Sequence, residues 1–234
     1  MGQARMEPSS PSPRSRKSIF LIAMSSDAVV LTDWQLHDVV NLIALQPGVM
    51  LSIVAIYKPY LRQALAVYMA AYIALDAVWM AVQPSIVRAP ITLLVHHAAT
   101  LILLLHSLSH APHLQYVPMM SLVEINTIFL ILRRQRSRGN ALVDVAFVSS
   151  WVALRVALLP AVAVRIACFD EGWGAISKVR HVVVSMCVLG LAAMQLLWTS
   201  QLFHRTASAM WARSQAVRAQ ASSGHDRSFE AAFL

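Results

Sequence analysis

The stretch Leu93-Leu94-Val95-His96-His97-Ala98-Ala99-Thr100-Leu101-Ile102-Leu103-Leu104-Leu105 is an apolar run with two adjacent histidines near its beginning. The residues from 90 to 108 are otherwise almost wholly apolar, which predicts a helix that crosses a membrane. An ionisable side chain at membrane depth is costly and normally faces a cavity or a partner. Because neighbours in a helix point about 100° apart, no single rotation hides both His96 and His97. Thr100 lies four residues after His96, so the three side chains predict a polar patch lining an intramembrane pocket.

The composition favours an integral membrane protein. The 234 residues are 58% hydrophobic and 13% charged, which is more apolar and less charged than a soluble domain. A formal net charge of +8 is compatible with nucleic-acid binding, but the basic residues are spread between the apolar runs, as membrane topology requires. We therefore expect no nucleic-acid partner. Two cysteines, Cys168 and Cys187, are too few for a disulfide framework.

Apolar runs near the ~20 residues that a bilayer requires recur along the chain. We expect an all-α polytopic bundle of about six transmembrane helices, at roughly 36–56, 63–82, 91–109, 117–132, 141–166 and 181–203. Three parts follow: a disordered N-terminal segment at 1–33, a transmembrane domain at 34–205 and a polar cytosolic tail at 206–234. Within the tail, residues 210–221 could form a short helix on the membrane surface.

The distribution of lysine and arginine predicts that both termini are cytosolic. With that orientation, the outside loops hold only Lys58, Arg62, Lys178 and Arg180, and most other basic residues are inside. The strongest anchor is the arginine-rich segment 133–138. It can act as a stop signal that touches anionic lipid, dock a partner, or bind the phosphate of an acyl-CoA.

Two predicted spans carry acidic side chains. Asp76, in the second span, either orients one of the histidines and raises its basicity or makes a structural hydrogen bond between helices. Glu124, in the fourth span, is either a satisfied core carboxylate or one that faces a substrate. Asn126 points away from Glu124, which predicts a helix buried on two sides.

Arg155 lies in the middle of the fifth predicted span and keeps its charge at ordinary pH. We expect an ion pair with Glu124 or Asp76, or else binding to an anionic head group.

Three further histidines, His106, His110 and His113, predict an interfacial loop. The four-residue spacing of the first two suits a metal ligand pair, but the histidine boxes of a di-iron oxygenase are not present, and we predict no metal site.

Two motifs together resemble the TLC family (TRAM, Lag1 and CLN8 homology). An Asp in one span is followed by the stretch 94–100 opening the next. The segment 122–133 is then similar to the family's Glu-x-Ser/Asn-Thr-x-Phe-x-x-x-Arg segment. The positions of Arg155 with Pro160, and of Gln195 to Trp198, are also comparable, so the resemblance covers about residues 34–205.

This resemblance implies a TLC-like multi-span bundle in the endoplasmic reticulum or a related endomembrane, acting in lipid metabolism. The ceramide synthase branch joins a fatty acyl-CoA to a sphingoid base amine, and its motif continues from the same histidine pair into an acidic half. Here the residues from Ser107 to Met120 contain no Asp, so the chain looks more similar to the small TLC domain-containing proteins than to the ceramide synthases. The first span also differs, because many relatives have Ser-x-x-His where this chain has Asn41-Leu42-Ile43-Ala44.

Three functions are compatible with these residues. The first is binding of a membrane lipid or acyl chain in a pocket lined by His96 and His97, in membrane lipid homeostasis, without a cofactor. Its pocket would also include Thr100, Glu124, Asn126 and Arg155. The alternative is an acyl-CoA-dependent N-acyltransferase of sphingolipid metabolism, with catalytic residues His96, His97 and Asp76 and fatty acyl-CoA as substrate. The third is a structural or chaperone-like membrane partner.

Overall fold

The computed structural model describes residues 20–22, 29–135, 140–169 and 177–230. Two short strands, β1 (Phe20–Ile22) and β2 (Val29–Leu31), pair antiparallel with Phe20 opposite Leu31. This pairing differs from the disorder expected for 1–33. Residues 1–19 and 23–28 of that segment lie outside the described part of the chain, so their predicted disorder stays a prediction.

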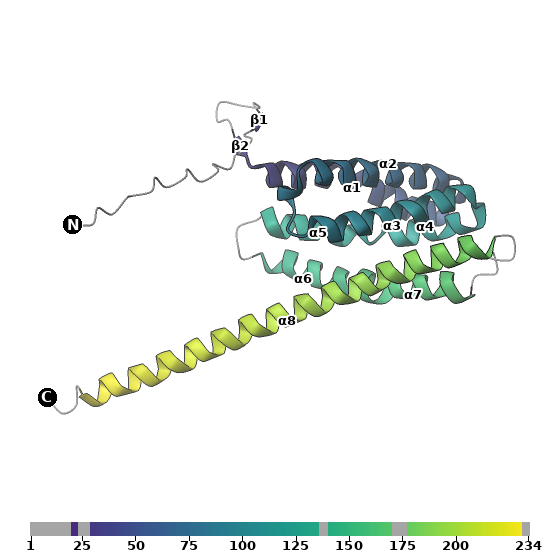
Figure 1. The fold of residues 1–234 in the computed structure, drawn as a ribbon. Coiled ribbons are helices and arrows are strands. Elements are labelled where there is room, and N and C mark those ends of the chain that lie inside the picture. The colour runs from purple at the N-terminus through teal and green to yellow at the C-terminus, as the bar shows by residue number, and fades with distance from the viewer. Residues whose placement is uncertain (1–19, 23–28, 136–139, 170–176, 231–234) are drawn as a thin grey trace, which may run out of the picture.

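Within these described ranges, six helical segments are long and apolar enough to cross a membrane, which confirms the predicted all-α bundle (Figure 1). The first three are α1 (Asp33–Tyr57), α2 (Arg62–Val82) and α3 (Pro90–Ser109), with the single turns η1 (Pro59–Leu61) and η2 (Pro84–Ile86) between them. The fourth comprises η3 (Ala111–Gln115), α4 (Tyr116–Ser121) and α5 (Glu124–Gln135). The fifth comprises α6 (Ala141–Ser150), η4 (Trp151–Leu158), α7 (Leu159–Val164) and η5 (Arg165–Phe169). The sixth is α8 (Lys178–Glu230). The predicted cytosolic side of the termini stays a prediction.

Local sequence signals fix several helix starts. Gln35 Oε1 accepts a hydrogen bond from the Thr32 backbone N–H at 3.0 Å, which completes a capping box at the start of α1. Pro90 occupies the first turn of α3, where its missing N–H costs nothing. The Asn140 side chain accepts from the backbone N–H groups of Leu142 and Val143 and so caps α6.

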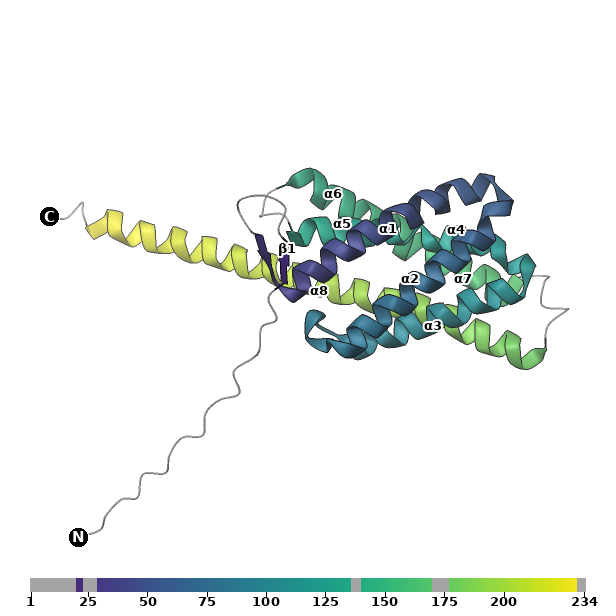
Figure 2. The ribbon, with the colours of Figure 1, turned by 90° about the horizontal axis from the view of Figure 1, so that it is seen from above.

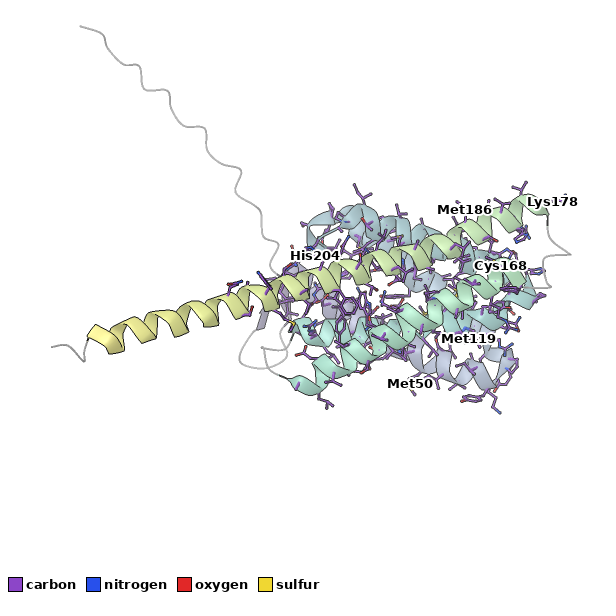
Figure 3. All side chains as sticks on the ribbon, turned by 90° about the horizontal axis from the view of Figure 1, so that it is seen from below. Met50, Met119, Cys168, Lys178, Met186 and His204 are labelled. Atoms are coloured by element: carbon purple, nitrogen blue, oxygen red, sulfur yellow. The ribbon has the colours of Figure 1, made fainter. Side chains whose placement is uncertain are left out.

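The helices pack around two apolar clusters that meet at α4. One cluster joins α1, α2 and α3 to Val117, and the other joins α7 and α8 to Tyr116. Helices α2 and α3 run side by side over much of their length (Figure 2). The outer surface is apolar too: Met50 and Met186 are 62% and 69% exposed and point away from the bundle (Figure 3). Such a surface is what a membrane protein presents to lipid.

The fourth and fifth crossings are interrupted helices. The sequence predicted an uninterrupted helix for each, at 117–132 and 141–166. Between α4 and α5 the Val123 backbone N–H donates to the Met120 carbonyl, three residues back, at 3.2 Å. Residues Trp151–Leu158 and Arg165–Phe169 are π-helical. Irregular backbone at membrane depth is tolerated where it is buried or lines a cavity, and π-helical turns often occur at functional sites.

The last helix also differs from expectation. The sequence suggested a polar tail after residue 205 with a separate short helix, but α8 continues without a break to Glu230 (Figure 1). The segment is rich in Ala, the residue that favours helix most, and Gly224 is the one glycine beyond residue 205.

Candidate functional site

Asp76 joins the first three helices through its carboxylate. The His37 Nε2 of α1 donates to Asp76 Oδ1 at 2.8 Å, and the His97 Nε2 of α3 lies 2.9 Å from Asp76 Oδ2. The Asn41 amide donates to the same carboxylate at 3.3 Å. Polar side chains at membrane depth normally pair with one another, as the Asp76 carboxylate does with its three partners. In this position Asp76 can orient a histidine, which is one of the two roles that the sequence suggested for it.

Both ring nitrogens of His97 are engaged. Its Nδ1 lies 2.8 Å from the Leu93 carbonyl oxygen, and since a carbonyl only accepts, Nδ1 carries a proton. A second proton must lie between Nε2 and Asp76. The residues that line the main cavity include His96 and not His97. The hydrogen bond to Asp76 turns the His97 ring toward α2, and the predicted role of His97 in ligand binding stays a prediction.

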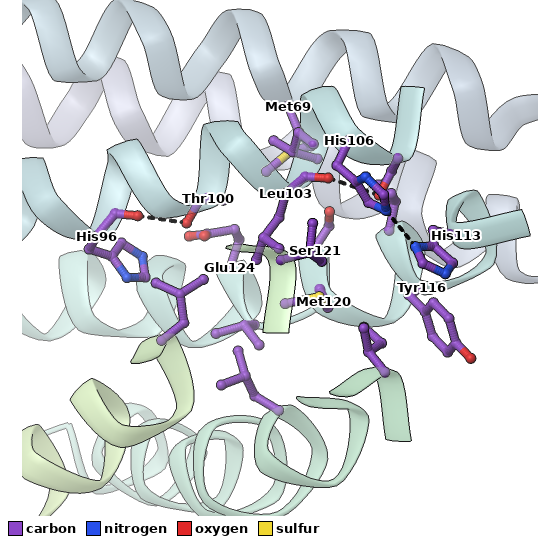
Figure 4. Close-up of a pocket in the computed structure, with 18 of the residues that line it drawn as sticks. Met69, His96, Thr100, Leu103, His106, His113, Tyr116, Met120, Ser121 and Glu124 are labelled. Carbon is purple, nitrogen blue, oxygen red and sulfur yellow. Dashed lines mark hydrogen bonds between the residues drawn. The ribbon is translucent and has the colours of Figure 1, made fainter. Parts of the chain in front are cut away.

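A cavity runs through the middle of the bundle (Figure 4). The space between its walls is about 800 Å³, a volume that includes the gaps between atoms and the part open to the surroundings, and water-sized spheres can be centred in about 80 Å³ of it. One end carries the polar residues His96, Thr100, Glu124, Arg155 and Gln195. The middle is apolar, and its lining includes Leu103, Leu104, Val117, Met120, Leu159 and Leu191. His106, Ser107, His113 and Tyr116 form the other end, and the ten residues from His96 to His106 set a separation of ~15 Å along α3.

His96 is the member of the histidine pair that faces this cavity. Its Nδ1 is buried and has no hydrogen-bond partner within the described segments. Its ring lies 5.6 Å from the Trp198 ring of α8, centroid to centroid. Thr100 Oγ1 donates to the His96 carbonyl at 2.9 Å, so the hydroxyl can still accept a hydrogen bond from a bound molecule.

Arg155, in the π-helical η4, is held by neutral groups. Its Nε donates to Asn126 Oδ1 at 2.8 Å, one terminal nitrogen to Gln195 Oε1 at 2.9 Å and the other to Thr127 Oγ1 at 2.8 Å. No ion pair joins it to a carboxylate in the described part of the chain, so the expected pairing with Glu124 or Asp76 is wrong. Asn126 rather than Glu124 faces η4, because residues two apart in a helix point ~200° from each other.

Asn126 and Glu124 therefore have different positions. Asn126 is fully buried and donates to the Phe147 carbonyl at 3.0 Å and to Ser150 Oγ at 2.9 Å. It lies behind the cavity wall and supports Arg155, as expected for a helix buried on two sides. Glu124 is the first residue of α5 and lines the cavity, where its side chain points toward the end that holds His96 and Thr100 (Figure 4).

Sequence reasoning missed His37 and did not recognise the role of Asn41. The two residues are four apart and share a face of α1, which was the available signal. His37 lies one residue inside the predicted start of its span, and it was not weighed as a membrane histidine. Both side chains are buried against Asp76, so the first span contributes to the polar cluster.

Two members of the second histidine group are buried in the protein, and the interfacial position of the loop stays a prediction. His106 Nε2 and His113 Nδ1 share a hydrogen bond of 2.7 Å, and the two residues are 7% and 2% exposed. Pro112 lies in η3, which folds His113 back over the end of α3. Across the ranges that the structure describes, no group of three or more His, Cys, Asp or Glu has an arrangement that could hold a metal ion.

The arginine-rich segment is partly tied to the protein. Arg133 Nε lies 2.7 Å from Asp144 Oδ1, and Arg134 lies 3.2 Å from the buried Asp38. Arg136 and Arg138 lie outside the described residues. The two described arginines therefore have structural partners, and their predicted roles toward lipid, partner or acyl-CoA remain predictions.

Comparison with protein families decides the relationship that the motifs suggested. A family model for the TLC domain matches residues 19–204. The chain belongs to this family. The TLC domain thus includes β1 and β2 and reaches into α8, whereas the sequence placed its start at residue 34. With six helices among its described residues that are long and apolar enough to cross a membrane, this TLC protein is an integral membrane protein. A search of curated proteins and a search of solved structures each returned no match.

Proposed function

We propose that this TLC protein binds the acyl chain of a membrane lipid in the central cavity and acts in membrane lipid homeostasis, in the endoplasmic reticulum or a related endomembrane. The observation that carries the proposal is the cavity itself, which has an apolar middle and a polar end lined by His96 and Glu124. A ligand that fits both is amphipathic, with one apolar chain and one polar head group.

Selectivity for one lipid over another comes from the polar end of the cavity. Lipid tails are as apolar as a leucine-lined wall, so an acyl chain gains little free energy by leaving the bilayer for the cavity. Buried polar groups without partners are costly, and a head group that satisfies them stabilises the complex. His96 Nδ1 is such a group.

The alternative function is an acyl-CoA-dependent N-acyltransferase, and the free Nδ1 of His96 favours it. In that reaction an amine nitrogen forms a bond to the acyl carbon, the C–S bond of the thioester breaks, and CoA leaves as the thiol. His96 would take the proton from the amine, and Asp76 and His97 would hold α2 and α3 in place. His97 has no unengaged ring nitrogen with which to act as a base.

Lipid mass spectrometry on cells that lack or overexpress the protein tests these functions. The variants are His96→Ala and the cavity-filling Leu103→Trp, with Ile102→Trp as the matched control because Ile102 is 43% exposed on the outer face of α3. We expect a broad shift in acyl composition that Leu103→Trp abolishes and Ile102→Trp keeps.

The other outcomes are equally informative. A change confined to one product class and lost in His96→Ala would establish the acyltransferase. An unchanged lipid profile in every strain would argue against both functions and favour a structural or chaperone-like role.

A further inference from the structure

The polar end of the cavity contains hydrogen-bond donors that the described residues do not use. The Arg155 guanidinium has five N–H groups, and three of them make the bonds to Asn126, Gln195 and Thr127. Gln195 is fully buried, and its Nε2 has no hydrogen-bond partner in the ranges that the structure describes. Both residues line the cavity, so this wall offers N–H groups to an acceptor on a ligand.

An acceptor without a donor lies on the same cavity. Glu124 makes no hydrogen bond and no ion pair with the described residues. Glu124 lies where α5 follows α4, and it lines the same cavity as Arg155. Glu124 and Arg155 therefore present opposite charges to one space without touching each other.

From this arrangement we infer that the ligand is a single-chain lipid with a net-neutral head group that carries both an acceptor and a donor, as a monoacylglycerol does. This inference rests on the proposed function. The ester carbonyl would accept from Arg155 and Gln195, and a hydroxyl would donate to Glu124. A second hydroxyl can reach His96 Nδ1 or Thr100.

Charge decides against simpler ligands. The opposite charges of Glu124 and Arg155 compensate each other at a distance, so a ligand with net charge would bring an uncompensated charge into a low-dielectric site. A free fatty acid would satisfy Arg155 but repel Glu124. An alkylamine would satisfy Glu124 but repel Arg155.

The test compares three ligands of equal chain length on the purified full chain in detergent. Monoolein, oleate and oleylamine each compete with a photoactivatable acyl probe, and the apparent Kd of each is measured. We expect monoolein to bind at least about tenfold more tightly than either charged ligand, the effect of losing one hydrogen bond to a charged group. This ranking is measured on the unmodified protein, so it does not depend on a variant that folds.

A charge variant then tests the assignment of Glu124. In Glu124→Gln the positive charge of Arg155 is no longer compensated, and we expect oleate to gain about tenfold relative to monoolein. Asp144→Asn is the matched control, because it removes a carboxylate from an exposed ion pair outside the cavity, and the ranking should not change.

Two results would overturn the inference in different ways. If oleate or oleylamine binds as tightly as monoolein, the head-group assignment is wrong and acyl-chain binding stands. If none of the three displaces the probe, both the inference and the proposed function fail.

Discussion

Removing the Asp76 carboxylate is expected to destabilise the bundle, and the cost can be worked from its contacts. The bonds to His37 and His97, at 2.8 and 2.9 Å, link α2 to α1 and α3. Side-chain hydrogen bonds between membrane helices contribute ~0.6 kcal/mol on average and up to ~1.7 kcal/mol. Two bonds at the upper end, with two buried ring nitrogens left without an acceptor, give a loss of at least about 3 kcal/mol in the free energy of unfolding for Asp76→Ala.

The isosteric change should be much milder. In Asp76→Asn the amide oxygen can accept from His37, while the amide N–H donates to the Nε2 of a neutral His97 whose Nδ1 still donates to Leu93. Both links between helices are kept, so we expect a loss below about 1 kcal/mol.

Unfolding of the purified protein in mixed micelles measures both variants. The control is Asp144→Ala, whose ion pair with Arg133 is about half exposed and should contribute no more than about 1 kcal/mol. A double-mutant cycle with His97→Ala isolates the pairwise term. The reasoning is refuted if Asp76→Asn is as damaging as Asp76→Ala, or if Asp76→Ala costs no more than the control.

Two further stability predictions follow from packing and from hydrogen bonds. A Cβ on Gly48 would lie 3.1 Å from a methionine and a tyrosine of α2, so Gly48→Val should lower the free energy of unfolding by ~1–3 kcal/mol. A Cβ on Gly190 meets open space, so Gly190→Ala should raise the free energy of unfolding by up to ~1 kcal/mol. Chemical denaturation measures both changes. Equal effects of the two substitutions would contradict this packing. Asn126→Ala should lower the free energy of unfolding by at least about 2 kcal/mol, since the buried Asn126 amide oxygen accepts a hydrogen bond from Arg155. Asn140→Ala, which removes an exposed helix cap, should lower it by only ~1 kcal/mol. An Asn126→Ala loss no larger than that of the cap would contradict the buried role.

The fold could be predicted from the sequence because membrane helices are recognised by the length and hydropathy of their apolar runs. All six crossings correspond to apolar runs near ~20 residues. The interruption before Glu124 and the π-helical turn around Arg155 were not predicted. Both depend on backbone packing against neighbouring helices, for which a single apolar run carries no signal.

The candidate site was only partly predictable. A contact between Asp76 and one of the two histidines was expected because they belong to consecutive spans, and the structure shows that contact with His97. The different positions of His96 and His97 were not predicted, since they depend on the Leu93 carbonyl, which accepts a hydrogen bond from His97 Nδ1. Arg155 was expected beside a carboxylate on grounds of charge, but the rotation of α5 placed Asn126 there instead.

Photo-crosslinking with an acyl chain probe tests most directly whether the cavity holds a lipid. The purified chain is labelled, digested and mapped by mass spectrometry, with and without excess unlabelled lipid. We predict saturable, competed labels on the cavity residues Leu103, Val117 and Leu191. Labelling confined to outward side chains such as Val95 and Leu105, which are 56% and 59% exposed, and insensitive to competitor, would contradict a lipid site inside the bundle.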